Sequence, residues 1–152
     1  MLTDSEFKDF IEDSNKIIDG DIEWQEDEDH SPSVEFRVRL QSTQNYPVFV
    51  QGFYNPLKLA LTYAIIHLKA GRIYGLDMGK EHPNPDRTRV GRIHKHRWTE
   101  EYQDKWAYRP PDITAPVTNP IEVWGQFCKE ASIRHNGVMQ NPPLGKGDTF
   151  LV

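Results

Sequence analysis

The chain contains a single cysteine, Cys128, among its 152 residues. One thiol excludes an internal disulfide and any zinc site built from cysteines alone. No apolar run reaches the roughly 18 residues that span a bilayer. The first six residues also lack the basic start and apolar core of a signal peptide. We therefore expect a cytoplasmic protein that makes no membrane contact.

The sequence also lacks the motifs of two common functional classes. Gly71, Gly75 and Gly79 stand at i, i+4 and i+8, which is not the spacing of a glycine-rich phosphate loop. No serine lies in the glycine-flanked pattern of a nucleophile elbow. These absences argue against a glycine-rich nucleotide site and against a serine hydrolase. They leave open whether the protein is an enzyme of another kind.

The chain does contain enough apolar material for one folded domain. Hydrophobic residues make up 37% and aromatic residues 11% of the sequence, and the mean hydropathy is -0.71. This composition is typical of a soluble globular protein. We expect a single domain over residues 1–136. The proline- and glycine-containing residues 137–152 are expected to form a flexible C-terminal tail.

Local patterns predict the order of helices and strands. Thr3 and Glu6 form a capping-box pattern, and Asn55-Pro56 and Asn119-Pro120 each have the form of a helix cap followed by a first turn. The expected elements are a helix over 3–19, strands over 21–25, 34–40 and 46–54, a helix over 55–70, strands over 72–79 and 87–97, and helices over 99–108 and 119–133. Short links between strands favour antiparallel pairing. The predicted fold is therefore α+β, with a single mostly antiparallel sheet of about five strands covered by helices.

Charge is distributed unevenly along the chain. The formal net charge is -5, yet residues 1–30 hold twelve acidic residues against two lysines. Such a run usually forms a solvated surface. The alternative is an interaction or inhibitor module in which Asp27, Glu28 and Asp29 contact a basic, nucleic-acid-handling partner protein.

Residues 86–97 are the main candidate for a functional site. They include five cations and two histidines against a single acid. Side chains alternate between the faces of a strand, so His94 and His96 would share one face while Lys95 and Arg97 share the other. Because both faces are polar, we expect this strand at an edge of the sheet or beside a site. Positive charge on an edge strand also prevents edge-to-edge association without any further role.

The first hypothesis for this stretch is an accessory protein that binds single-stranded RNA. Guanidinium and ammonium groups would contact phosphates, and aromatic side chains would stack on unpaired bases. Two imidazoles would act as general base and acid in weak, metal-independent RNA cleavage. The candidates are Arg89, Arg92, Lys95 and Arg97 for phosphate, Trp98 and Tyr102 for base stacking, and His94 and His96 for catalysis.

The second hypothesis is a site for zinc or another divalent metal. Two imidazoles on one strand face supply two nitrogen ligands, and a further histidine or carboxylate would complete the set. His94 and His96 would provide two ligands, and His82, Asp77 or Glu100 would provide the third. The RNA-binding hypothesis requires no cofactor, whereas this one requires the metal.

The segment from His94 to Ala107 reads HKHRWTEEYQDKWA and follows Leu76-Asp77 and His82-Pro-Asn84. In these residues the chain resembles a group of small, uncharacterised bacterial and phage-borne proteins. The resemblance covers residues 70–135. It implies a bacterial or prophage setting and supplies no activity.

Overall fold

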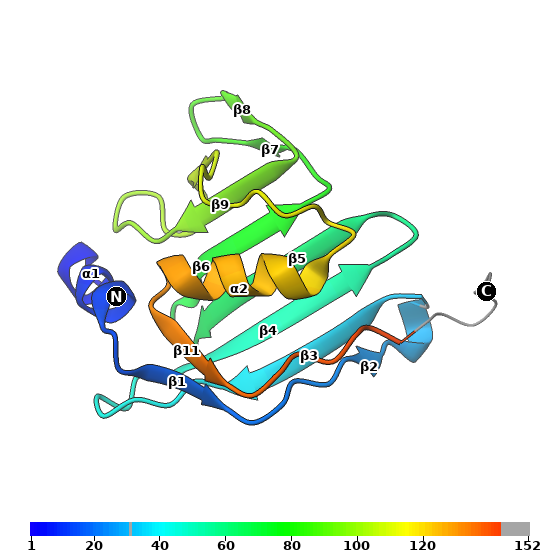
Figure 1. The fold of residues 1–152 in the computed structure, drawn as a ribbon. Helices are drawn as coiled ribbons and strands as arrows, with labels where there is room; N and C mark the ends of the chain where they lie inside the picture. Colours follow the sequence, from blue (N-terminus) through cyan, green and yellow to red (C-terminus); the bar gives the residue numbers. More distant parts are fainter. Residues whose placement is uncertain (31, 144–152) are drawn as a thin grey trace, which may run out of the picture.

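The computed structural model describes residues 1–30 and 32–143. Within this part of the chain, seven strands form one antiparallel sheet in the order β10-β9-β6-β5-β4-β3-β2 (Figure 1). The strands are β2 (Gln25–Glu26), β3 (Val34–Arg39), β4 (Val48–Asn55), β5 (Ala60–His67), β6 (Gly71–Met78), β9 (Ile93–Arg97) and β10 (Ala107–Tyr108). From β2 to β6, strands that follow one another in sequence also pair in space.

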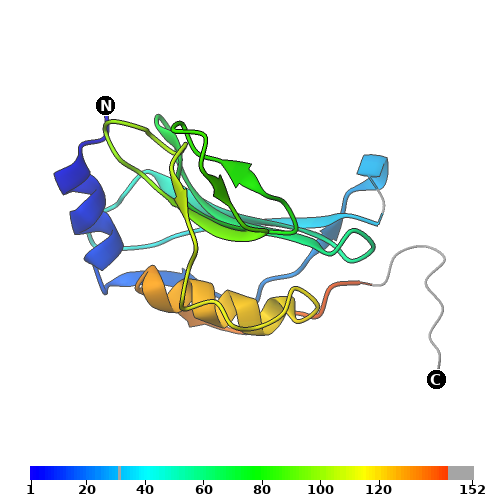
Figure 2. The same cartoon turned by 90° about the horizontal axis from the view of Figure 1, so that it is seen from above.

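The link between β6 and β9 contains a small separate hairpin. Its strands are β7 (His82–Pro83) and β8 (Arg89–Val90), which pair with each other and form their own two-stranded sheet. Figure 2 shows this hairpin on one side of the main sheet and helix α2 (Pro120–Glu130) on the other. We call the side facing α2 the inner face and the side facing the hairpin the outer face.

The hydrophobic core lies between the inner face and α2. Tyr63 of β5 is fully buried against Trp124 of the helix, with the ring centroids 5.1 Å apart. The Tyr63 hydroxyl donates a hydrogen bond to the carbonyl oxygen of Pro120 at 2.6 Å. Phe36 packs edge-on against Trp24 and against Trp124. This aromatic cluster fixes α2 on the sheet, because edge-on and tilted ring pairs favour defined geometries.

The N-terminal helix α1 (Asp4–Glu12) begins with the predicted capping box and ends earlier than predicted. Residues 16–19, expected as its last turn, form strand β1 (Lys16–Asp19) instead. This strand pairs in parallel with β11 (Ile133–Asn136), a contact between sequence-distant segments that local helical spacing does not reveal. The Lys16 ammonium donates to the carbonyl oxygens of Phe10, Ile11 and Asp13 and so caps the end of α1. A 3-10 turn, η1 (Glu28–His30), separates β2 from β3.

The predicted helix over 55–70 is wrong, because this segment forms a turn and strand β5. Asn55 does make the predicted cap contacts, with its side-chain oxygen accepting from the backbone N–H groups of Leu57 and Lys58. The chain then reverses at Leu59, whose φ is 52°. A central strand that is buried on one face and partly covered on the other is apolar almost throughout, and periodicity cannot distinguish it from a buried helix.

The predicted helix over 99–108 is wrong for a similar reason. The Thr99 hydroxyl accepts from the backbone N–H of Tyr102, as a cap would. Gln103 has a φ of 56°, however, and its N–H and C=O both bond back to Thr99. The segment is thus a tight turn that leads into β10. The α+β prediction holds, but the main sheet has seven strands rather than five, and β1–β11 and β7–β8 form two small further sheets. The main sheet gains β5 and β10, and the predicted strand over 21–25 is reduced to an isolated bridge at Ile22 and the first residue of β2.

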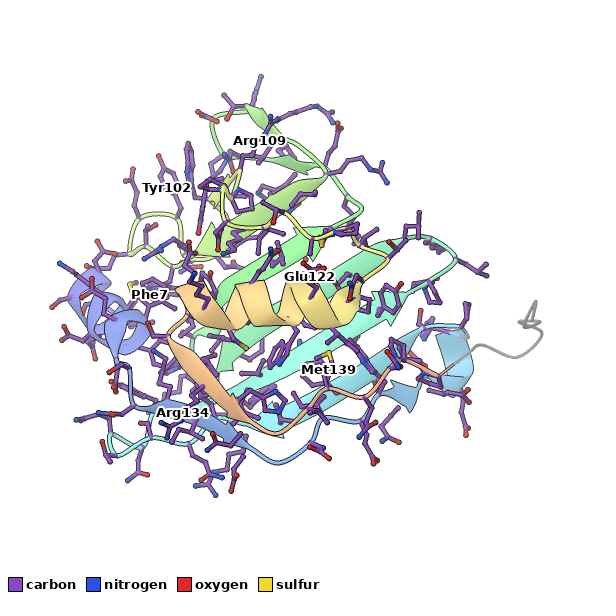
Figure 3. The ribbon with its side chains drawn as sticks, in the orientation of Figure 1. Phe7, Tyr102, Arg109, Glu122, Arg134 and Met139 are labelled. Atoms are coloured by element: carbon purple, nitrogen blue, oxygen red, sulfur yellow. The ribbon has the colours of Figure 1, made fainter. Side chains whose placement is uncertain are left out.

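The last predicted helix is present as α2, with Asn119 as its cap, and it ends before Ser132, whose φ is 56°. The predicted tail is described only up to residue 143, and residues 144–152 lie outside the described part. Its first residues continue along the domain: Ile22 exchanges backbone hydrogen bonds with Val138 and Gln140, and Met139 is buried beside α2 (Figure 3). Among the described residues, no helix is both long and apolar enough to cross a membrane.

Candidate metal centre

Strand register brings Asp77 and the two histidines of β9 together on the outer face. β6 pairs with β9 so that Asp77 lies opposite His94 and Gly75 lies opposite His96. Lys95 lies opposite Leu76 and points to the inner face. The predicted separation of the histidines from Lys95 along this strand is confirmed.

β9 is not an exposed edge strand. β10 pairs with it at Lys95 and His96, and the loop that leads to β10 covers its outer face. The side chains of His94 and His96 are only 2% and 1% exposed. Edge protection therefore does not explain why these two residues are histidine.

A third histidine reaches the same place from the hairpin. The ring of His82, in β7, has its centroid 4.6 Å from that of His96 and 5.5 Å from that of His94. One ring nitrogen from each of the three side chains lies within 4.8 Å of the other two. Among the described residues, this is the one group of three or more such side chains that could hold a metal ion.

Backbone carbonyl groups determine which nitrogen of each ring is free. Nδ1 of His94 lies 3.0 Å from the Gly91 oxygen, and Nδ1 of His96 lies 2.7 Å from the Asp104 oxygen. Nε2 of His82 lies 2.8 Å from the Lys105 oxygen. A carbonyl oxygen can only accept, so each of these nitrogens carries the proton. In the neutral rings, Nε2 of His94, Nε2 of His96 and Nδ1 of His82 therefore carry lone pairs.

Two of these nitrogens lie close to a carboxylate. Oδ2 of Asp77 lies 3.3 Å from Nε2 of His94 and 3.2 Å from Nε2 of His96. Nε2 of His96 is buried and, despite this distance, has no hydrogen-bond partner among the described residues. A nitrogen lone pair beside a carboxylate is repelled by it, so a proton or a metal cation at these nitrogens would stabilise the contact.

The carboxylate of Asp77 is itself held in place by its neighbours. Oδ1 accepts a hydrogen bond from the Thr62 hydroxyl at 2.7 Å, and Oδ2 accepts one from the Arg72 guanidinium at 3.2 Å. Arg72 also bonds to Asp104. Its side chain lies across Gly75, where a Cβ would come within 2.9 Å of the Arg72 Cδ.

The charge states follow from these contacts. Burial by itself would raise the pKa of Asp77, but the adjacent nitrogens of His94 and His96, the Thr62 hydrogen bond and the Arg72 charge outweigh it and hold that pKa well below its usual range. Burial lowers the pKa of His82, so its ring is neutral near pH 7. The site therefore combines an ionised carboxylate with imidazole nitrogens.

Glu100 does not join this cluster. Its carboxylate accepts from the backbone N–H of Asp4 at 3.1 Å, and the Asp4 carboxylate accepts from the N–H of Glu100 in return. Glu100 thus attaches the turn after β9 to the start of α1. Of the predicted metal ligands, the structure brings together His82, His94 and His96, and Asp77, predicted as an alternative third ligand, lies beside the two β9 histidines.

The predicted phosphate-binding residues do not share one surface. Lys95 is fully buried on the inner face, where its ammonium pairs with Asp112 at 2.6 Å and Glu130 at 3.0 Å. Arg97 lies near the same Glu130. Arg89 and Arg92 are exposed around the hairpin and bond to Glu81 and to the Gly79 oxygen.

The two predicted base-stacking residues differ in accessibility. Trp98 is 5% exposed, and its indole N–H donates to the Leu2 oxygen. Tyr102 is partly exposed and stacks on Trp106 at 5.1 Å between ring centroids. The predicted partner-binding residues Asp27, Glu28 and Asp29 lie at η1, remote in the sheet order from β9.

Sequence patterns did not indicate Thr62, Arg72 or Asp104 as parts of the site. Thr62 reaches Asp77 because β5 pairs with β6 in a register that places the two residues opposite each other. Asp104 contributes both a carboxylate and a backbone carbonyl, and the carbonyl group has no sequence signal. Gly75, two residues before Asp77, was the one local indication that a side chain crosses the sheet there.

Residues 2–133 match the model of a family of unknown function, DUF6978. The chain belongs to the DUF6978 family. The match confirms the predicted resemblance to an uncharacterised group and extends it from residues 70–135 to most of the domain. Asp77 and the three clustered histidines lie within residues 2–133, the part of the chain that the family model matches. No curated protein and no solved structure matches the chain.

Proposed function

We propose that the protein binds a divalent transition metal, with zinc as the best fit, through His82, His94, His96 and Asp77. The proposal rests on one observation: the buried Nε2 of His96 has no hydrogen-bond partner among the described residues and lies 3.2 Å from Oδ2 of Asp77. Imidazole nitrogen with one carboxylate oxygen is a donor set that zinc accepts.

The outer contacts of the histidines support the same proposal. Histidines that bind metals usually donate their second ring N–H to a carbonyl or carboxylate, which fixes the tautomer and the ring orientation. All three histidines make such a bond, to Gly91, Asp104 and Lys105. Three neutral rings with their free nitrogens converging are arranged for a cation.

The spacing of the ligand atoms also fits a zinc ion. With Zn–N and Zn–O bonds of about 2.0–2.1 Å, two ligands on a tetrahedral zinc stand about 3.3–3.4 Å apart. The Nε2 atoms of His94 and His96 lie 3.3 and 3.2 Å from Oδ2 of Asp77. Each of these nitrogens is therefore close to the distance from Oδ2 that a shared metal needs.

The competing arrangement has protons in place of the metal. Both β9 histidines would then be imidazolium ions that donate to Asp77, with ring centroids 5.0 Å apart and the Arg72 guanidinium beside them. Three positive charges would share this carboxylate in a largely buried place, where like charges disfavour one another strongly. A zinc ion held by neutral histidines brings the same two positive charges beside Arg72, so zinc titration, and not repulsion, distinguishes the two arrangements.

Zinc titration of the chelator-treated protein by calorimetry tests the proposal. We expect one zinc per chain. His96→Ala should weaken zinc binding by more than the roughly 10–100-fold that follows removal of a residue that only hydrogen-bonds a metal ligand. His30→Ala is the control, because the His30 side chain is 75% exposed and its imidazole bonds only to Asp27 among the described residues. Absence of zinc binding by the wild type, or equal affinity of His96→Ala, would overturn the proposal.

The RNA-binding hypothesis and the acidic-segment hypothesis stay predictions. Single-stranded RNA would have to rely on exposed groups such as Arg89, Arg92 and Tyr102, since His94 and His96 are buried. Binding of a single-stranded RNA oligonucleotide by wild type and by Arg89→Ala/Arg92→Ala measures whether these guanidinium groups contact phosphate. The site geometry favours the metal as the first function to test.

A further inference from the structure

We propose that the bound metal draws the β7–β8 hairpin onto the sheet, so that the order of this hairpin depends on metal occupancy. This inference rests on the proposed metal site. It assigns different roles to the ligands: His94, His96 and Asp77 form a fixed half of the site, and His82 is a movable half supplied by the hairpin.

The fixed half is held by strands on both sides. β9 pairs with β6 along Ile93–Arg97 and with β10 at Lys95 and His96. The rings of His94 and His96 are also anchored to carbonyl groups, and Asp77 is anchored by Thr62 and Arg72. Moving these ligands would break ladder hydrogen bonds of the main sheet, so they supply a rigid platform.

The hairpin has far fewer attachments. It forms its own two-stranded sheet, and most of its side chains between Glu81 and Arg89 are exposed. Its buried anchor is Asn84, whose side chain exchanges two hydrogen bonds with the backbone of Ala107. His82 adds a bond to the Lys105 oxygen. An element with little buried apolar surface opens locally at low free-energy cost.

The placement of the three histidines shows which half of the site can move. One ring nitrogen from each side chain lies within 4.8 Å of the other two, whereas ligands on a tetrahedral zinc stand about 3.3–3.4 Å apart. His94 and His96 are held on one strand of the main sheet, so any adjustment around a bound metal falls on His82 and the hairpin.

Limited proteolysis with trypsin tests the proposal on the full chain. Arg87 and Arg89 are exposed in the hairpin, and Lys58, exposed in the β4–β5 turn outside the hairpin, is an internal control site. When the free zinc concentration is ten times the dissociation constant, hairpin openings that release the metal become about tenfold less frequent. We therefore expect zinc to slow cleavage after Arg87 and Arg89 about tenfold and to leave cleavage after Lys58 unchanged.

The variant His82→Ala separates the two halves of the site. It should still bind zinc, more weakly, through His94, His96 and Asp77, and zinc at saturating concentration should no longer protect Arg87 and Arg89. If the wild type binds zinc by calorimetry but cleavage in the hairpin is unchanged, or if His82→Ala keeps the full protection, the inference is wrong and the metal site stands. If the wild type binds no zinc, the proposed function itself fails.

Discussion

Two glycines on opposite faces of the sheet offer a matched pair of substitutions. Gly52 in β4 lies on the inner face opposite Phe36, and Gly75 in β6 lies on the outer face beneath Arg72. A Cβ at Gly52 would lie 2.2 Å from Cε2 of Phe36. Carbon atoms in contact prefer about 3.5–4.0 Å, so the ring would have to move by about 1.3–1.8 Å.

The Phe36 ring has no space for such a movement. It is 5% exposed, with Trp24 at 4.9 Å, Trp124 at 5.6 Å and Tyr63 at 6.0 Å between ring centroids. Overpacking of a close-packed core costs about 1–3 kcal/mol. For a domain of this size we expect Gly52→Ala to lower Tm by about 2–12 °C.

Gly75→Ala is the control for this prediction. Its Cβ would meet the Arg72 Cδ at 2.9 Å, but that atom belongs to a flexible and partly exposed side chain that can turn away. A shift of Cδ by about 0.6–1.1 Å relieves the contact and still lets Arg72 pair with Asp77 and Asp104, so we expect a smaller loss of stability than for Gly52→Ala. Urea unfolding followed by tryptophan fluorescence measures both variants. Unfolding of Gly52→Ala at the same midpoint urea concentration as the wild type would contradict the close packing of Phe36 on the inner face.

Three further predictions concern the metal, a buried cation and a buried hydroxyl. Zinc at 100 times its dissociation constant should stabilise the protein by about 2.7 kcal/mol, seen as a rise in Tm that His96→Ala lacks. Burial lowers the pKa of Lys16 to about 8, against 10.5 in its ordinary state, so between these values the unfolded chain binds more protons and stability rises with pH. From pH 8 to 9.5 wild type should therefore gain about 1.6 kcal/mol relative to Lys16→Met in urea unfolding, and equal pH profiles would contradict this. Tyr63→Phe, which leaves the Pro120 oxygen without its buried donor, should cost about 1–3 kcal/mol in the same assay, and no loss would mean that the bond adds nothing.

Local chemistry in the sequence was often right where the predicted element was wrong. Asn55 and Thr99 both accept the backbone N–H bonds expected of helix caps. The chain nevertheless turns at Leu59 and Gln103, where φ is positive. A cap contact satisfies two or three residues, whereas continuation as helix or hairpin depends on what the following apolar residues pack against.

In the candidate site, too, local patterns predicted some features correctly and left others open. The alternation of side chains along a strand was enough to place His94 and His96 on one face and Lys95 on the other. The sequence also indicated His82 and Asp77 as possible ligands. It could not choose between Asp77 and Glu100, because both are carboxylates at plausible distances along the chain.

By itself, the sequence was enough to predict the α+β class, the cap of α1 and the start of α2. It also predicted that the two β9 histidines share one face of their strand. These features depend on neighbours within a few residues. Tertiary structure alone decided that β6 pairs with β9 in the register that sets Asp77 opposite His94, that the hairpin delivers His82, and that carbonyl groups of Gly91, Asp104 and Lys105 fix the ring tautomers. The physical reason is that strand register and loop position are set by the packing of the whole sheet, and only that packing removes water from the histidines and brings their free nitrogens together.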